Sequence, residues 1–155
     1  MNNTPSCCPG SRAWAVFLLR VALGMCMLWA GLHKFGLGGG SGYAETVAML
    51  TGMFDKTLLA GFPSSIFAHA LPFLEAGSGL LLLIGLRTRC GLVLAGLTLL
   101  GLGFGLMILG KPEMMTAQLL IYVLILLDAA ALALLDGGNA FSIDACRERH
   151  CAPKP

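Results

Sequence analysis

The stretch at residues 90–110, CGLVLAGLTLLGLGFGLMILG, decides the fold, because it contains no charged residue and is long enough to cross a bilayer. The hydrocarbon core of a membrane is about 30 Å thick, and a helix that rises about 1.5 Å per residue crosses it with about 20 residues. Three more apolar stretches have this length, at residues 13–35, 66–86 and 114–135. The sequence therefore predicts four membrane-spanning helices.

The composition supports the same class of protein. Hydrophobic residues make up 57% of the 155 residues and charged residues 12%, with a mean hydropathy of +0.82. Soluble domains are about 45–50% apolar and about a quarter charged, so this chain belongs with integral membrane proteins. The net charge is only +2, and the Lys and Arg residues form no basic stripe, which excludes nucleic acid as a partner.

The connections between the spans determine the architecture. Residues 87–89 separate the second and third spans, and residues 111–113 separate the third and fourth. Such short connections hold neighbouring helices antiparallel. The longer piece between the first two spans carries Val47, Leu50 and Phe54 at helical spacing, which predicts a short interfacial helix over residues 44–60. We expect an all-α integral membrane domain over residues 13–136, with four transmembrane helices in an antiparallel bundle.

The distribution of basic residues predicts the orientation. The side that receives both ends of the chain carries more Lys and Arg than the other, namely Arg12, Arg87, Arg89, Arg147, Arg149 and Lys154 against Lys34, Lys56 and Lys111. Basic residues are enriched on the cytoplasmic side of membrane proteins. The tails at residues 1–12 and 137–155 are therefore expected in the cytoplasm.

Three ionisable residues, Arg20, Glu75 and Asp128, lie inside the predicted spans. Such groups usually face the bundle interior and find partners. Counted from the expected cytoplasmic edge, all three lie at depths of roughly 12 to 17 Å. Two carboxylates at one place need a cation between them, so the sequence predicts that Arg20 bridges Glu75 and Asp128. This cluster is either a structural clasp or a site where Glu75 exchanges protons or binds a quinone or substrate.

A second polar cluster is expected near the opposite membrane face, with His33, Lys34, His69 and Glu113. Lys34 can extend to the interface and Glu113 can cap a helix start, which explains both without a function. His33 and His69 are either solvated or able to bind a metal, a haem or a quinone carbonyl. We therefore take His33, Lys34 and His69 as candidate cofactor-binding residues.

The third span has many glycines, and Gly101 and Gly105 are spaced so that another helix can approach closely. We expect this glycine face to pack within the bundle rather than to form a dimer seam. The sequence contains no glycine-rich nucleotide loop, no nucleophile elbow and no HExxH motif. Catalysis by this chain alone is therefore not expected.

Four of the six cysteines, Cys7, Cys8, Cys146 and Cys151, lie in the tails. In the cytoplasm they would stay reduced, and their spacing matches no zinc-site pattern. They are either unengaged thiols or ligands for soft metals or partners in disulfide exchange. Cys26 and Cys90 lie within the spans, and we expect them to be small apolar fillers.

Several blocks occur in a characteristic order: LLRVALG at 18–24, WAGLHKFG at 29–36, LEAGSGL at 74–80, IGLRTR at 84–89, GG at 137–138 and FSID at 141–144. Together they resemble the DoxX family, small four-helix membrane proteins of bacteria and archaea, over residues 13–144. Arg20, Lys34 and Glu75 match polar positions that recur in the family. The tail cysteines, and a closing segment without the family's proline between its glycines, depart from the pattern.

The resemblance implies a place in the inner membrane as a subunit of a redox complex, because relatives belong to a thiosulfate:quinone oxidoreductase or to thiol and oxidative-stress complexes. We expect the chain to link oxidation of a thiol or reduced sulfur donor, held by a partner redox subunit, to membrane quinone. In this hypothesis Glu75 is the proton-linked or quinone-binding acid, assisted by Arg20 and Asp128. Two alternatives stay open, as does homo-oligomer formation. One is a transporter of soft metal ions or thiol compounds that uses the tail cysteines, and the other is a structural membrane partner without a site.

Overall fold

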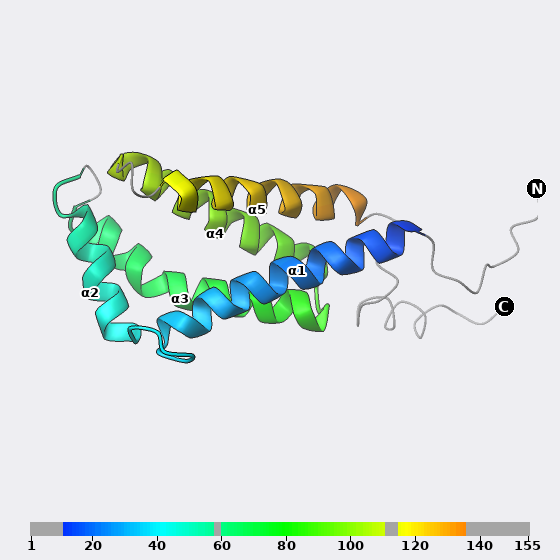
Figure 1. The fold of residues 1–155 in the computed structure, drawn as a ribbon, viewed down its shortest axis with the longest axis horizontal. Coiled ribbons are helices and arrows are strands. Elements are labelled where there is room, and N and C mark those ends of the chain that lie inside the picture. Colours follow the sequence, from blue (N-terminus) through cyan, green and yellow to red (C-terminus); the bar gives the residue numbers. More distant parts are fainter. Residues whose placement is uncertain (1–10, 58–59, 111–114, 136–155) are drawn as a thin grey trace, which may run out of the picture.

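The computed structural model describes residues 11–57, 60–110 and 115–135. Its helices are α1 (Ser11–Lys34), α2 (Tyr43–Phe54), α3 (Phe62–Ile84), α4 (Thr88–Leu109) and α5 (Met115–Leu134) (Figure 1). All except α2 are long and apolar enough to cross a membrane, which confirms the expected all-α membrane fold with four spans. The helix α2 is the short helix predicted between the first two spans. Most of the predicted tails lies outside the described residues, and α1 already includes Ser11 and Arg12.

Local sequence signals explain where the helices begin and end. The helix α3 starts at Phe62, earlier than the predicted residue 66, because Pro63 fits the first turn of a helix, where its missing N–H is not needed. Gly85 and Gly110 end α3 and α4 in the left-handed conformation, with φ of 72° and 58°. Their backbone N–H groups donate to the carbonyls of Leu81 and Leu106. The ending at Gly85 allows the sharp turn from α3 into α4.

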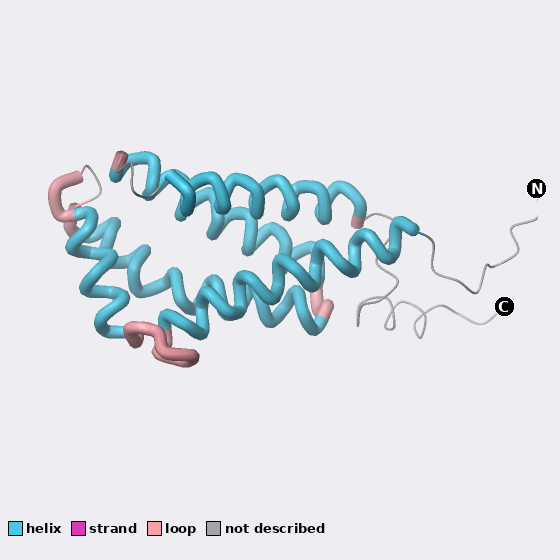
Figure 2. Tube along the Cα trace, in the orientation of Figure 1, coloured by secondary structure: helices cyan, strands magenta, loops and turns pink. Residues whose placement is uncertain are grey.

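The helices form two layers, with α1 and α3 in one and α4 and α5 in the other, and α2 lies across one end (Figure 1). The described loops lie at the ends of the bundle (Figure 2). The start of α1 and the end of α5 lie at the same end, where Arg12 Nε donates a hydrogen bond of 3.2 Å to the Leu134 carbonyl. This carbonyl belongs to the last turn of α5, which has no helical partner for it. We call the opposite end, which α2 covers, the α2 end.

Glycines allow the closest helix contacts. A Cβ at Gly31 of α1 would lie 2.6 Å from the backbone nitrogen of Ala76 in α3. On α4, Gly91 faces Leu82 of α3, while Gly103 faces Ile121 of α5. The expected packing of the α4 glycines inside the bundle is therefore confirmed. Close approach through small residues is the usual way in which helices associate in lipid.

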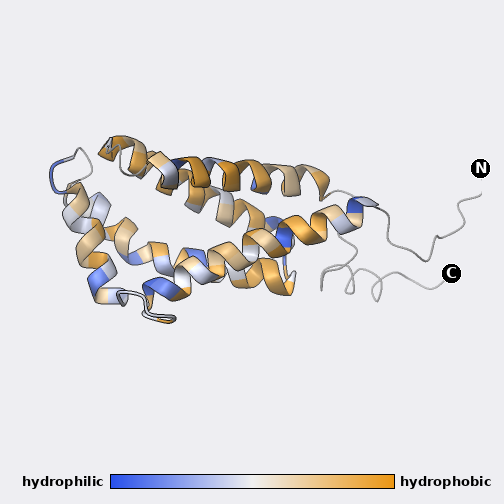
Figure 3. Cartoon of the chain, in the orientation of Figure 1, coloured by the Kyte–Doolittle hydropathy of each residue, from blue (hydrophilic) through white to orange (hydrophobic). Residues whose placement is uncertain are grey.

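The outer surface of the bundle is apolar. Leu18, Leu97, Met107 and Leu126 are 61–69% exposed, and hydrophobic residues cover most of the four long helices (Figure 3). Soluble monomers rarely expose such continuous apolar surface. These helices span a bilayer, and their outer faces contact lipid.

Cys26 and Cys90 are exposed free thiols, so the expectation that they fill gaps in the core is wrong. Cys26 lies within α1 and points toward lipid, whereas Cys90 lies in the first turn of α4, near the membrane surface. The expectation rested on the small size of cysteine, which does not indicate whether the side chain points inward or outward. Both residues lie on the outward faces of their helices.

This difference in depth leads to a prediction about reactivity. In chains that retain only one cysteine, a water-soluble maleimide should label Cys90 in membranes and leave Cys26 unlabelled, because the reagent reaches thiols at the membrane surface and not thiols that face lipid. Labelling is measured as a mass increase, with detergent-denatured protein as the control for full reactivity. Equal labelling of the two thiols in membranes would contradict the placement of α1 in the bilayer.

Candidate functional site

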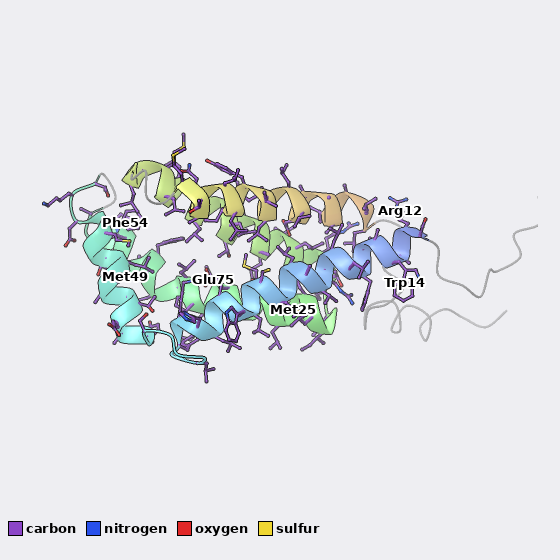
Figure 4. All side chains as sticks on the ribbon, in the orientation of Figure 1. Arg12, Trp14, Met25, Met49, Phe54 and Glu75 are labelled. Carbon is purple, nitrogen blue, oxygen red and sulfur yellow. The ribbon has the colours of Figure 1, made fainter. Side chains whose placement is uncertain are left out.

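The main polar contact inside the bundle is an ion pair between α1 and α3. Lys34 Nζ lies 2.5 Å from Glu75 Oε2, and the side chains are 22% and 3% exposed. Glu75 shares the inward face of α3 with Leu71, Ser78 and Leu82, all of them buried. Figure 4 shows Glu75 between α3 and α1, toward the α2 end. Lys34 therefore does not simply extend into the interface, because its ammonium group turns inward to a buried carboxylate.

The predicted Arg20 bridge between Glu75 and Asp128 is wrong, because Glu75 pairs with Lys34. The contacts of Gly31 with Ala76 and of Gly24 with Leu82 set the antiparallel register of α1 and α3. This register places Arg20 level with the end of α3, roughly 16 Å along the helix axis from Glu75. Arg20 is buried, and its guanidinium carbon lies 5.8 Å from the centroid of the Phe17 ring.

The predicted depth of Arg20 was wrong because the start of α1 and the end of α3 were assumed to lie at the same level in the membrane. The start of α1 extends beyond the end of α3 (Figure 1). A count from Arg12 therefore begins farther out than a count from Leu86.

Asp128 lies on α5 and is 6% exposed. Its Oδ2 lies against Gly96 of α4, where a Cβ would come within 2.5 Å of it. Because α4 also places Gly101 against Phe67 and Gly91 against Leu82, Glu75 and Asp128 lie at similar depths on two sides of α4. The similar depth of the two acids fits the prediction from the sequence, although within the described residues the hydrogen-bonded partner of Glu75 is Lys34 rather than Asp128.

Four rings meet at the α2 end, and we call Phe35, Tyr43, Phe73 and His69 the aromatic cluster. Phe35 stacks on Tyr43 with centroids 5.9 Å apart, and Phe73 meets both rings edge-on. His69 meets Tyr43 edge-on at 6.1 Å. Phe35 directly follows Lys34, the last residue of α1, so the aromatic cluster lies at the same end of the bundle as the ion pair. Phe73 points outward from α3 and is 59% exposed, whereas Glu75 points inward.

The two candidate histidines have different surroundings. His69 Nδ1 lies 2.7 Å from the Ser65 carbonyl, which can only accept, so Nδ1 carries a proton and a neutral ring keeps Nε2 as an acceptor. His33 is exposed, and its ring lies 6.4 Å from that of Trp29. Among residues 11–57, 60–110 and 115–135, no group of three or more His, Cys, Asp or Glu is placed to hold a metal ion.

The N-terminus of α2 is attached to the end of α1 beside this site. Thr46 is buried and its hydroxyl donates to the Lys34 carbonyl at 3.4 Å, and Ser41 Oγ lies 3.1 Å from Thr46 Oγ1. These contacts fix Tyr43 above Phe73. Sequence reasoning missed the aromatic residues, although the spacing of His69 and Phe73 by four residues already placed those two on one helix face.

An apolar pocket of about 240 Å³ lies between α2, α3 and α4, with Phe54, Phe67 and Phe104 among its walls. It carries no charged side chain, so it is not a candidate for chemistry. Several predicted residues lie outside the described part of the chain: Cys7, Cys8, Glu113, Cys146 and Cys151. The hypothesis of metal or thiol transport depends on those cysteines and stays a prediction.

The comparison with protein families identifies the DoxX family. The model of the DoxX family matches residues 15–108, which include nearly all of α1 and the whole of α2, α3 and α4 up to Ile108. No curated protein and no solved structure shows a significant similarity to the chain.

Proposed function

Because the chain belongs to the DoxX family of membrane proteins, we propose that it is the membrane subunit of a redox complex that links thiol or reduced-sulfur oxidation to membrane quinone. A partner subunit would oxidise the sulfur compound, and this chain would offer the quinone site. The proposal places the chain in the cytoplasmic membrane of a bacterium or archaeon, with both termini in the cytoplasm as the basic residues predict. The observation that supports it most is that the aromatic cluster and the ion pair of Lys34 and Glu75 lie at the same end of the bundle.

The aromatic cluster and the ion pair together offer the groups that a quinone head group would need. A quinone is a flat ring with two carbonyl oxygens, and it takes up two electrons and two protons when it is reduced. The rings of Phe35, Tyr43 and Phe73 offer apolar faces for stacking against such a ring. Quinones reach the site from the bilayer, which surrounds the exposed Phe73.

The polar groups around the aromatic cluster have distinct roles in this proposal. The Lys34 ammonium group has three N–H donors and uses one for Glu75, so it can donate another to a carbonyl oxygen. Glu75 holds the ammonium group in place and balances its charge. His69 can accept or return a proton at Nε2, because Nδ1 is engaged by Ser65. Arg20 and Asp128 lie outside this set, so Glu75 acts here with Lys34 instead.

The test begins with the intact chain. We would purify it with a tag from its native membrane in a mild detergent and identify proteins and lipids that copurify by mass spectrometry. We expect stoichiometric quinone together with an oxidoreductase that handles thiols or sulfur compounds. A chain that carries only phospholipid would overturn the proposal.

The role of Glu75 gives a specific prediction. Glu75→Gln should lower retained quinone and quinone-linked turnover about tenfold, which corresponds to about 1.4 kcal/mol for a weakened charge-assisted contact. Glu45→Gln is the matched control, because Glu45 is an exposed acid in the first turn of α2. Unchanged turnover in an assembled Glu75→Gln protein would remove Glu75 from the mechanism and leave a purely structural ion pair.

A further inference from the structure

Asp128 is the second buried acid of the bundle, and its surroundings differ from those of Glu75. Asp128 is only 6% exposed. Its Oδ1 has no hydrogen-bond partner in the described part of the chain. Glu75, in contrast, is bound by Lys34. The missing side chain of Gly96 provides the space for Oδ2. The glycine face of α4 and this carboxyl group thus form a small polar site inside the bundle, between α4 and α5.

The helices packed against α5 are α4 and α1. Arg12 of α1 reaches the end of α5 and donates to the Leu134 carbonyl, and the guanidinium of Arg20 lies over the Phe17 ring. Within the described residues no ion pair joins Asp128 to any charged group. The other titratable groups on these three helices are Cys26, His33 and Lys34 on α1, Arg89 and Cys90 on α4, and Tyr122 on α5.

We propose that Asp128 is a proton-binding site, a carboxyl group that holds its proton inside the bundle and exchanges it from the membrane side where α5 ends. An ionised carboxylate without a cation is strongly disfavoured in a hydrocarbon environment, and uptake of a proton removes the charge. A metal ion would need several oxygen or nitrogen ligands at one place. The described residues offer no such group around Asp128.

This site is suited to supply protons to the middle of the bundle. Asp128 lies six residues before the end of α5, roughly 9 Å along the axis, and at about the depth of Glu75 on the other side of α4. A proton that enters at the α5 end therefore reaches the depth of the ion pair when it reaches Asp128. The assignment does not depend on the proposed redox function, because it rests on the burial and the missing partner of this one carboxyl group.

A hydrophobic carbodiimide tests the proposal in the full chain in lipid nanodiscs. The O–H of a protonated carboxyl adds across one C=N bond of the carbodiimide, and the resulting O-acylisourea rearranges to a stable N-acylurea without a leaving group. We expect the label on Asp128, located by peptide mass spectrometry, with less labelling as the pH rises. The label should be lost in Asp128→Asn and kept in Asp55→Asn, which changes an exposed acid.

Infrared spectroscopy keeps the test decisive if Asp128→Asn fails to fold. In wild-type chain with ¹³C-labelled aspartate, the C=O band of a protonated carboxyl in an apolar site should shift with the isotope. ¹³C-labelled glutamate should leave it unchanged. An unlabelled Asp128 together with the absence of an aspartate C=O band would overturn the proposal. Because neither readout uses quinone, failure here is distinguishable from failure of the redox function.

Discussion

Replacement of Lys34 by methionine is expected to lower the free energy of unfolding by about 3 kcal/mol, because the removal of one partner of a buried ion pair leaves the other charge uncompensated. Glu75 is 3% exposed, and Lys34 Nζ at 2.5 Å is its hydrogen-bond partner. Methionine retains much of the length of the lysine side chain, so the loss reports on the charge rather than on a cavity. Unfolding is measured by loss of helical circular dichroism as sodium dodecyl sulfate is added to the protein in mild detergent.

A double variant separates the charge effect from packing. Lys34→Met with Glu75→Gln removes both charges and should recover most of the lost stability, since a pair replaced as a unit leaves no isolated charge. Lys56→Met is the matched control, because Lys56 is exposed just after α2, and it should change stability by less than about 0.5 kcal/mol. If Lys34→Met were as stable as the wild type, the ion pair would not hold the end of α1 to α3.

The four spans could be predicted from the sequence because lipid imposes a length and a hydrophobicity that few other structures share. The predicted span at 90–110 and the observed α4 at Thr88–Leu109 differ by two residues or fewer at each end. The short helix α2 ends at Phe54 rather than at the predicted residue 60, and among the four spans the largest error was the start of α3. Pro63, Ser64 and Ser65 lowered the apolar signal there, although proline and serine are compatible with the first turn of a helix.

The site was predicted in part. Glu75 could be identified as a buried functional candidate, because a carboxylate inside an apolar span needs a reason to be there. Its partner could not, because the register of α1 against α3 is set by the contacts of Gly31 and Gly79. A shift of one helix along the other changes which cation faces Glu75 without any change in the hydropathy pattern. The choice of Arg20 over Lys34 was therefore undetermined by the sequence.

The aromatic cluster shows a different limit. Its members come from the loop after α1, from the start of α2 and from α3, so no single segment contains the pattern. The position of Tyr43 depends on how α2 crosses the end of the bundle. That crossing is fixed by contacts such as the hydrogen bond from the Thr46 hydroxyl to the Lys34 carbonyl. The sequence of a short helix does not indicate which carbonyl such a hydroxyl group will contact.

The different surroundings of the two buried acids suggest that Glu75 and Asp128 have different roles. Glu75 is paired with the Lys34 cation at the end of the bundle that holds the aromatic cluster, and it is suited to hold an electrically balanced binding site. Asp128 has an apolar environment and a glycine cradle, and it is suited to gain and lose a proton. If both proposals hold, Glu75→Gln should impair quinone retention and leave carbodiimide labelling intact, and Asp128→Asn should do the reverse.

The second large effect is expected from Gly79→Ala, which adds one methyl group where α3 touches α1. The new Cβ would come within contact distance of the Leu28 backbone nitrogen and lie 2.8 Å from the Gly24 carbonyl oxygen. Backbone atoms cannot move aside as a side chain can, so the helices must separate. We expect a loss on the order of 3 kcal/mol, at the upper end of the usual cost of overpacking. The same detergent titration measures it.

Gly77→Ala supplies the matched control on the same helix. A Cβ at Gly77 meets nothing within 4 Å, so the substitution adds no clash. Alanine also favours a helix over glycine by roughly 0.5–1 kcal/mol, and Gly77→Ala should therefore leave stability unchanged or raise it slightly. Helix separation in Gly79→Ala would also pull Lys34 from Glu75, so this variant should lose quinone while Gly77→Ala retains it. Equal stability of the two variants would show that α1 and α3 do not approach as closely as Gly79 allows. It would then also contradict the helix register that pairs Lys34 with Glu75.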